Sequence, residues 1–364
     1  MGHNRHVIVA GRVARMMAAA ARAAGYMPLV IDSFGDVDTL KIAADHKTLR
    51  YVGEQIDFLH FEQQLAHFAS HHAEALPLCW TSGWEASAHV LCALATRWPI
   101  LGSHPRALFR LADPKFARDM PQQEFLPNGD AVQTAASLIK TRAASGGHHV
   151  RYRKDEIFLS AAEFFQPYVH GVSLSNVCFA NETAVHVLGW NQHVALQESP
   201  AAPFRQSGAV AIEAPEVSPK LRPFLQVLAK NLGLAGVFGC DFIQLEDGGL
   251  KLVDVNPRPT ASAPLHVPLE KLFTLHANPR VFGAPEIDRG DVLFTGTAVI
   301  YAEVPIVIPK TLHWPSWVSD IPRCDEAIQA GQPICTIWAD QWPAAAAKEQ
   351  LRERQYKLLA LVSK

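Results

Sequence analysis

The chain has 364 residues, of which 49% are hydrophobic, so it can form two or three domains with sizeable cores. Its 33 lysine and arginine residues nearly balance its 35 aspartate and glutamate residues. The resulting net charge of −2 excludes a global field that would draw the protein to nucleic acid or to an anionic membrane, so any anion-binding site must be local.

The six cysteines and the start of the chain indicate a cytoplasmic protein. No two cysteines form a C-x-x-C pair or have zinc-site spacing, which fits reduced thiols. The first acidic residue is Asp32, so the basic N-terminus could resemble a transit peptide. However, residues 7–10 read as a strand that leads into a helix, and this apolar run is too short for a signal peptide or a membrane segment.

Residues 1–104 alternate strands and helices as a small doubly wound α/β domain does. Short apolar runs predict its strands at 7–10, 28–32, 76–80 and 100–101. Gly11 and Asp32 suggest a nicotinamide site, but the G-x-G-x-x-G fingerprint is absent. We interpret the turn at 82–85 as structural rather than catalytic.

Residues 102–115 are rich in turn formers and basic residues, as is typical of a domain junction. Lys115 follows Asp113 and Pro114 near the start of an expected helix. By itself, such a lysine is more often a solvated surface group than a ligand.

The stretch 137–150 predicts a strand, a lysine and a glycine-rich loop in that order. Lys140 ends the apolar strand, and Ser145, Gly146 and Gly147 lie in the loop. Two adjacent glycines let backbone N–H groups turn inward as an anion-binding nest, and the lysine adds a point charge. It is not a Walker loop, because no G-K-[ST] follows.

Further along, residues 164–171 read as a strand, 174–180 and 184–190 as a hairpin, and 218–232 as a helix. Beyond residue 281 we expect short strands around 292–301, 303–308 and 334–339, and a final helix over 344–361. We assign no chemistry to this tail.

The most informative stretch, residues 237–258, predicts a β-hairpin with a turn at 246–249. If Leu245 pairs with Leu250, then Asp241 lies opposite Asp254, and both carboxylates share one face of the sheet. Their Cβ atoms are then about 4.5–5.5 Å apart, so the two aspartates repel each other unless a cation lies between them.

Asn256 projects from the same face and adds a neutral oxygen, which completes the kind of all-oxygen set that Mg²⁺ prefers together with phosphates and waters. Arg258 follows just beyond the strand and can bind a phosphate or a carboxylate. An ordinary hairpin with solvated acidic residues would explain any single aspartate, but the combination favours a metal and phosphate site.

The pairing of G-x-D-F with D-x-N-P-R resembles the last two strands of the ATP-grasp nucleotide-binding fold. That family more often has Glu at the position of Asp254. The resemblance implies a mixed α/β fold: an N-terminal doubly wound α/β domain at 1–104, a two-subdomain ATP-grasp core (α+β) at 105–280, and a small β-rich module with a terminal helix at 281–364.

The resemblance also implies roles for individual residues. Asp241, Asp254 and Asn256 are expected to hold one or two Mg²⁺ ions, with Mn²⁺ as an alternative, against the phosphates of ATP. Lys140 and Arg258 are expected to be catalytic. The remaining expected nucleotide contacts are Lys115, Lys140, Ser145, Gly146, Gly147, Gln166, Tyr168 and Val169, the last three against adenine.

The function implied by the resemblance is an Mg-ATP-dependent ligase that activates a small carboxylate as an acyl phosphate and joins it to an amine. Cofactor biosynthesis is a possible setting, and a homodimer is compatible with it; neither nucleic acid nor a membrane is an expected partner. Two alternatives stay open: a carboxylase or kinase on the same fold, and a nucleotide-binding subunit without turnover.

Overall fold

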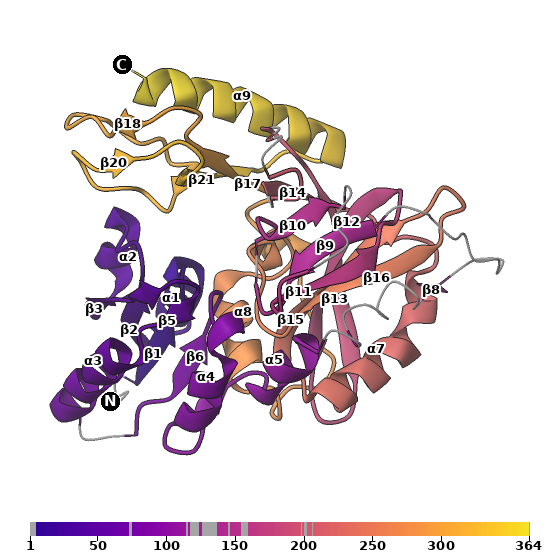
Figure 1. The fold of residues 1–364 in the computed structure, drawn as a ribbon, viewed down its shortest axis with the longest axis horizontal. Coiled ribbons are helices and arrows are strands. Elements are labelled where there is room, and N and C mark those ends of the chain that lie inside the picture. Colours follow the sequence, from indigo (N-terminus) through magenta and orange to yellow (C-terminus); the bar gives the residue numbers. More distant parts are fainter. Residues whose placement is uncertain are drawn as a thin grey trace.

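The computed structural model describes residues 5–72, 75–113, 116, 124–125, 137–144, 146–153, 159–197, 199, 202–205 and 207–363. It has a mixed α/β architecture, with a parallel sheet in the N-terminal part and antiparallel sheets in the core (Figure 1). Lys115 and Ser145, two of the expected nucleotide contacts, lie outside the described residues.

The N-terminal part contains a five-stranded parallel sheet in the order β3-β2-β1-β6-β7, as expected of a doubly wound domain. Its strands are β1 (His6–Ala10), β2 (Met27–Asp32), β3 (Asp45–Thr48), β6 (Leu78–Trp80) and β7 (Ile100–Leu101). Strand β3 was not predicted from the sequence, because it is an edge strand with the polar sequence D-H-K-T.

Helices and a short hairpin surround this sheet. They are α1 (Arg15–Ala23), α2 (Val37–Ile42), α3 (Phe58–His71), η1 (Glu85–Ser87), α4 (Ala88–Leu94), α5 (Arg106–Leu111) and the hairpin of β4 (Tyr51–Val52) with β5 (Gln55–Ile56). The small alanine side chains of α1 let it pack closely on the sheet, and four of its residues are buried.

A nine-stranded, mainly antiparallel sheet forms the centre of the molecule, in the order β19-β21-β17-β14-β13-β12-β15-β16-β8 (Figure 1). Its strands are β8 (Glu124–Phe125), β12 (Val172–Ala180), β13 (Val185–His193), β14 (Gly208–Ile212), β15 (Gly236–Gln244), β16 (Leu250–Asn256), β17 (Gly296–Tyr301), β19 (Val318–Ser319) and β21 (Pro333–Ala339). The last three come from the C-terminal tail, so the tail extends the central sheet through the pairing of β14 with β17.

The two faces of the central sheet bury different partners. On one face, Phe242 and Leu252 pack with Leu221 and Leu225 of α7 (Ser218–Leu232), whose leucines recur on one side of the helix. On the other face, Val237 packs with α8 (Leu269–Ala277) and with the N-terminal domain. Because side chains alternate along a strand, Asp241 points to the same face as Val237, the one that meets the N-terminal domain.

A separate three-stranded antiparallel sheet of the order β10-β9-β11 lies in front of the central sheet (Figure 1). Its strands are β9 (Ser137–Thr141), β10 (Val150–Tyr152) and β11 (Glu163–Pro167). Phe164 of β11 packs against the core cluster that contains Phe242, so the small sheet is anchored to the central one.

The C-terminal tail adds the hairpin of β18 (Ile306–Val307) with β20 (Ala327–Ile328), and the long helix α9 (Ala344–Val362), which covers β17 and β21 (Figure 1). Short one-turn helices complete the described elements: η3 (Ala263–Leu265) and η4 (Arg289–Asp291). The strand expected at 303–308 is therefore much shorter than the sequence suggested, because only Ile306 and Val307 find a partner.

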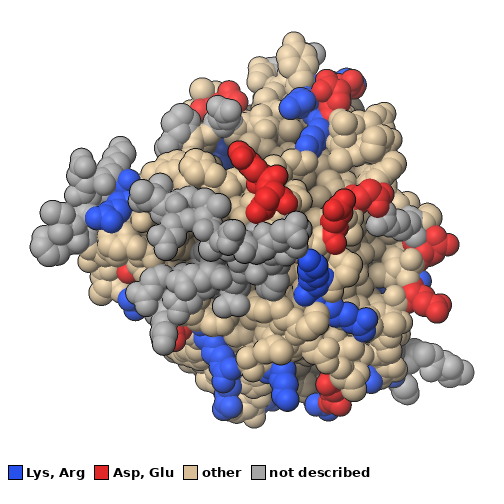
Figure 2. Space-filling view, turned by 90° about the vertical axis from the view of Figure 1, so that its right-hand side faces the viewer, with Lys and Arg blue, Asp and Glu red and all other residues tan. Residues whose placement is uncertain are grey.

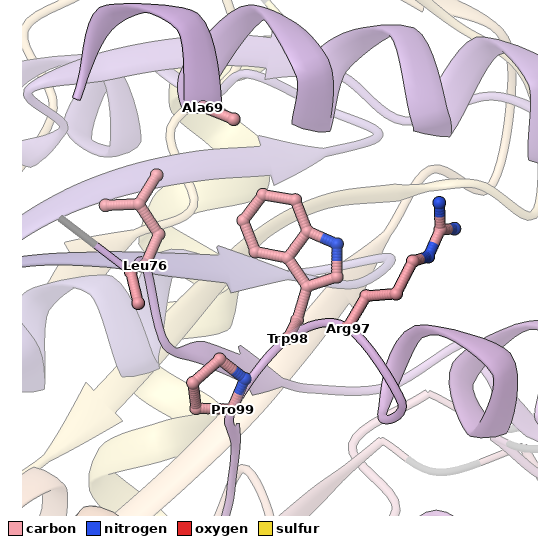
Figure 3. Close-up of a pocket in the computed structure, with 6 residues that line it drawn as sticks. Ala69, Leu76, Arg97, Trp98 and Pro99 are labelled. Atoms are coloured by element: carbon pink, nitrogen blue, oxygen red, sulfur yellow. The ribbon is translucent and has the colours of Figure 1, made fainter. Parts of the chain in front are cut away.

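The charge distribution of the surface and one small cavity bear on where a binding site can lie. Basic and acidic side chains are interspersed on the face shown in Figure 2, in line with the near-zero net charge. A small apolar cavity of about 170 Å³ lies in the N-terminal domain beside α3, lined by Leu76 and Trp98 among others (Figure 3). It is far in the fold from the predicted site. Within the described residues, no helix is both long and apolar enough to cross a membrane.

Candidate functional site

The hairpin of β15 and β16 brings the two aspartates opposite each other, as the sequence predicts. Asp241 pairs with Asp254, and Gly239 pairs with Asn256. The predicted pairing near the turn is wrong by one residue, since Gln244 rather than Leu245 lies opposite Leu250. A bulge between the two halves of the ladder takes up the difference, because one extra residue on β16 restores the register before Asp254.

The three expected metal ligands lie side by side on one face. The amide Nδ2 of Asn256 donates to Oδ2 of Asp241 at 3.4 Å. His193 of β13 reaches over from the same face, with its Nε2 3.9 Å from Oδ1 of Asp241. The Asp254 side chain is exposed, whereas that of Asp241 is 24% exposed, so solvent or a ligand can reach both carboxylates.

The surroundings of this pair disfavour two negative charges. Neighbouring protein atoms reduce the hydration of both carboxylates, and this desolvation raises the pKa of Asp241 and of Asp254 although solvent still reaches Asp254. Repulsion from Asp254 raises the pKa of Asp241 further, while Lys140 and Arg258 oppose the shift. Burial lowers the pKa of His193 to about 4, so this neighbour is neutral at physiological pH and does not compensate the charge.

A divalent cation fits this arrangement, because two facing carboxylates and an amide oxygen are ligands that Mg²⁺ accepts. In this structure the amide NH₂ of Asn256 faces Asp241, and the oxygen of the same group is the atom that a cation would take. In the described part of the chain, no three His, Cys, Asp or Glu side chains gather into a metal cluster.

Lys140 lies near the acidic pair although it belongs to the other sheet. It is on β9, opposite Phe164 of β11 and Val150 of β10. Burial lowers the pKa of its ammonium group, and the charges of Asp254 and then Asp241 act in the opposite direction. These two carboxylates are the charges that act on Lys140, so the lysine lies near the candidate metal ligands.

The glycine-rich loop after β9 has the backbone that its sequence suggests. Gly146 and Gly147 both have φ +77°, a conformation that side chains with a Cβ rarely adopt. A Cβ on Gly147 would lie 1.8 Å from the carbonyl oxygen of Phe204, whereas the nearest atom to a Cβ on Gly146 is 3.4 Å away. The loop therefore touches the segment 202–205 closely at Gly147.

The residues expected to contact adenine lie on strand β11 of the small sheet or directly after it. Gln166 is buried on β11 opposite Leu138, and side chains at this position point to the same face as Lys140. Tyr168 lies just after the strand, with its ring 5.4 Å from that of Tyr152 and 4.6 Å from that of His170. Val169 is next to it and partly buried.

Arg258 is held by a residue that we expected to be structural. Its Nη2 lies 3.2 Å from Oε1 of Glu85, and the two side chains are only 11% and 17% exposed. The other oxygen of Glu85 accepts a hydrogen bond from the backbone N–H of Gly83 at 2.9 Å. The Nε of Arg258 is buried and has no hydrogen-bond partner in the described part of the chain. The N-terminal domain thus contributes a carboxylate directly beside the acidic pair.

A row of polar side chains on the central sheet was also missed. Ser175 lies opposite Asp241, and Asn191 lies opposite Ser175, so the row crosses three strands. Asn191 is fully buried, donates from Nδ2 to Oγ of Ser175 at 3.4 Å, and its Oδ1 is 2.8 Å from Nε2 of His266. Polar residues at alternating positions of otherwise apolar strands were the signal in the sequence.

Comparison with known proteins identifies a family model over the part of the chain that contains this site. Residues 117–262 match the family model described as an ATP-grasp domain, a range that contains the small sheet and the hairpin with the acidic pair. A comparison with curated protein sequences gives no match.

Solved structures of similar fold cover nearly the whole chain. The biotin carboxylase domain of the 2-oxoglutarate carboxylase from Hydrogenobacter thermophilus, in a complex with MgADP, ADP and bicarbonate, is 13% identical with a TM-score of 0.67, over 97% of this chain and 90% of that chain. The N5-carboxyaminoimidazole synthetase from Staphylococcus aureus, in complex with ADP, is 12% identical with a TM-score of 0.66, over 98% of both chains.

A third similar structure is the N5-carboxyaminoimidazole ribonucleotide synthetase from Thermus thermophilus, which is 17% identical over 99% of both chains, with a TM-score of 0.65. Identities this low show a common fold and not a common substrate. Residues 117–262 therefore match an ATP-grasp domain, and the whole chain shares its fold with these structures.

Proposed function

We propose that this protein is an ADP-forming ligase that activates a small carboxylate with Mg-ATP and joins it to an amine. The observation that carries the proposal is the facing pair Asp241 and Asp254, with Asn256 beside it and Lys140 opposite. Burial raises the pKa of both carboxylates and repulsion from Asp254 adds to the shift of Asp241, so a divalent cation would stabilise the pair.

The proposed roles follow from position. Asp241, Asp254 and Asn256 hold Mg²⁺, or Mn²⁺ in its place, and this metal neutralises charge on the outer phosphates of ATP. Lys140 and the backbone of Gly146 and Gly147 bind phosphate oxygens. For Lys115 and Ser145 we retain the nucleotide contacts expected from the sequence.

The nucleotide base has a second set of proposed contacts. Gln166, Tyr168 and Val169 line the adenine through the backbone at the end of β11 and through ring packing. Because Lys140 and Gln166 lie on the small sheet and Tyr168 and Val169 follow directly after β11, this part of the structure can bind the two ends of one ATP molecule.

The proposed reaction has two steps. A carboxylate oxygen of the substrate attacks the γ-phosphorus, the bond from that phosphorus to the bridging oxygen breaks, and ADP leaves. The amine nitrogen then attacks the carbonyl carbon of the acyl phosphate, orthophosphate leaves, and the amine loses a proton to solvent. Lys140 and Arg258 supply positive charge where negative charge develops on the transferred phosphoryl group.

A carboxylase is the second candidate, because one similar structure is a biotin carboxylase domain with bicarbonate bound. In that case bicarbonate would take the place of the carboxylate substrate. The same biotin carboxylase structure is a domain dimer, and on that ground we propose a homodimer for this chain.

Product analysis tests the function. Purified protein is incubated with Mg-ATP and a panel of small carboxylates, with and without amines, and the nucleotide products and acyl hydroxamates formed with hydroxylamine are measured. The ligase predicts ADP and orthophosphate, release that an amine stimulates, and a trapped hydroxamate. Formation of AMP and pyrophosphate would rule the ligase out, and ADP release that needs bicarbonate and gives no hydroxamate would favour the carboxylase.

A further inference from the structure

The acidic pair faces the edge of the N-terminal sheet where its strand order reverses. From β1 the chain builds outward to β2 and β3 on one side, and then returns to place β6 on the other. In open α/β sheets, ligands bind at the carboxyl ends of the strands at such a switch point. The loops after β1 and β6 meet there, since the N–H of Arg12 donates to the carbonyl oxygen of Ser82 at 2.7 Å.

The first of these loops presents the guanidinium group of Arg12, which contacts Tyr51 and Glu54. Arg12 lies over the ring of Tyr51, with 4.5 Å from its central carbon to the ring centre. Its ion pair with Glu54 is 3.6 Å long, and the Glu54 side chain is 78% exposed. An exposed ion pair of this kind contributes little free energy, so a ligand carboxylate can displace Glu54 from Arg12 at a small energetic cost. The Nε of Arg12 is buried and makes no hydrogen bond to any described residue.

The second loop presents the carboxylate of Glu85, which has two partners. Glu85 accepts from the N–H of Gly83 through one oxygen and pairs with Arg258 through the other. Glu85 also lies close enough to the acidic pair to raise the pKa of Asp254. Of the two charged groups on this edge, Glu85 is therefore the one next to the proposed site of acyl transfer.

Tyr51 lies between Arg12 and Glu85, and we call these three residues the wall of the N-terminal domain. Its hydroxyl donates to the carbonyl oxygen of Gly83 at 3.2 Å, and a Cβ on Gly83 would lie 2.3 Å from that hydroxyl and 2.8 Å from the Cβ of Arg12. Both Arg12 and Glu85 act electrostatically on the Tyr51 hydroxyl. Tyr51 and Gly83 thus lie between a cation, Arg12, and an anion, Glu85.

The glycine-rich loop also approaches Arg12. His148, next to Gly147, is subject to the charges of Arg205, Arg12 and Glu54. The loop that we assign to the ATP phosphates therefore also approaches the wall of the N-terminal domain. A molecule bound at Arg12 and Glu85 would lie between this wall and the activated carboxylate.

We propose that the amine substrate is an amino acid, or another small amine that carries its own carboxylate. Arg12 binds the carboxylate, Glu85 holds the amino group beside the acyl phosphate, and Tyr51 separates the two contacts. When Glu85 turns to the amine, Arg258 is released to bind the phosphate or carboxylate of the other substrate. This inference rests on the proposed ligase function and adds the class of its amine substrate.

A binding experiment tests the inference without knowledge of the carboxylate partner. The full chain, saturated with Mg²⁺ and ADP, is titrated by calorimetry with each common L-amino acid, with its decarboxylated amine, and with its carboxamide. We expect at least one amino acid to bind at least tenfold more tightly than its amine and its carboxamide, since a charge-assisted pair with an arginine is lost in both analogues.

Single-residue variants then test which side chain binds the carboxylate and which binds the amino group of the amino acid. Arg12→Met should bind the amino acid as weakly as wild type binds the carboxamide, and Glu85→Gln should weaken amino acid binding at least tenfold. Glu54→Gln should leave the affinity unchanged or increase it, because it removes the competing partner of Arg12. Arg97→Met is the matched control, since Arg97 forms an exposed pair with Glu62 elsewhere in the same domain.

Three outcomes overturn the inference: no amino acid binds, the decarboxylated amine binds as tightly as the amino acid, or Arg12→Met binds like wild type. ADP release stimulated by simple amines, together with any of these, would remove the amino acid assignment and leave the ligase function standing. Failure of the ligase function itself shows separately, as ADP formation that no amine stimulates and no hydroxamate accompanies.

Discussion

Glu85 and Arg258, which are 173 positions apart in the sequence, form an ion pair with 3.2 Å between Oε1 and Nη2. Both side chains are nearly buried, so the pair connects the N-terminal domain to the end of the strand that carries the candidate metal ligands. A buried charge that loses its partner is costly, whereas removal of both charges together is often tolerated. Single and double variants of this pair can therefore distinguish a role in stability from a role in catalysis.

We predict that Arg258→Met lowers the free energy of unfolding by about 1–3 kcal/mol, because it leaves Glu85 buried without a countercharge. The double variant Arg258→Met/Glu85→Gln should recover most of this loss but have no ATP turnover. Chemical denaturation and ADP release measure the two properties. The exposed pair of Arg97 with Glu62 is the control, and Arg97→Met should change stability by less than about 0.5 kcal/mol. Turnover in the double variant would show that Arg258 is structural only.

For the metal ligands, we expect Asp254→Asn to abolish Mg-dependent ATP turnover while the protein remains folded, because the change removes a ligand and not core volume. Asp241→Asn should do less damage, since Asp254 and Asn256 remain. The thermal shift that Mg²⁺ induces with ADP present provides a readout without turnover, and it should be lost in Asp254→Asn. Near-normal activity in that variant would end the metal assignment.

Lys140 and Arg142 make a matched comparison of two neighbouring cations. Lys140→Ala should weaken ATP binding or turnover strongly, because Lys140 faces the acidic pair from the small sheet. Arg142→Ala should have a smaller effect, because Arg142 follows the strand in the loop. Calorimetry with ATP and steady-state ADP release measure both. Equal small losses in the two variants would contradict the placement of Lys140 at the phosphates.

The two adjacent glycines give a second matched pair. Both have φ +77°, so alanine is strained at each, but only Gly147 would place its Cβ against the backbone of Phe204. Gly147→Ala should therefore lower turnover and increase proteolytic cleavage of the loop more than Gly146→Ala does. If the two variants behave alike, the contact between the loop and the segment 202–205 has no role in closing the site.

The nearly buried carboxyl group of Asp36 should make the free energy of unfolding depend on pH. Burial first, and then the nearby carboxylates of Asp320, Asp32, Asp38 and Glu326, raise its pKa from 3.8 to about 8. Opposing cations also lie at this junction: the Nε of Arg15 pairs with Asp320 at 2.6 Å, and the Nε of Arg323 donates to the carbonyl oxygen of Gly35 at 3.1 Å. Asp36 is thus a nearly buried acid at the contact between the N-terminal domain and the C-terminal tail.

Because the pKa is higher in the folded state, the folded protein binds the proton of Asp36 more tightly. Its contribution to stability is full below pH 3.8 and is lost as the pH rises through about 8. Denaturation at pH 6 and pH 9 should show Asp36→Asn more stable than wild type at pH 9, by about 1–3 kcal/mol, with a smaller difference at pH 6. Glu349→Gln on the exposed face of α9 is the control. A parallel pH profile in wild type and Asp36→Asn would refute the assignment.

Features encoded by neighbouring residues could be predicted from the sequence. The hairpin at 237–258 follows from its turn and from the alternation of its side chains, and this local pattern places Asp241, Asp254 and Asn256 on one face. The register near the turn was wrong by one residue, because a bulge depends on how the strand packs and bends and leaves little trace in the residue types.

The tertiary structure alone decided what surrounds this hairpin. Glu85 reaches Arg258, and Lys140 faces the acidic pair, only because the N-terminal domain and the small sheet pack against the central sheet. Periodicity shows which face of an element is apolar, but it does not show which distant element covers that face. The sequence by itself therefore determined that two carboxylates and an amide share one face of the hairpin, and long-range packing decided which charges lie near them.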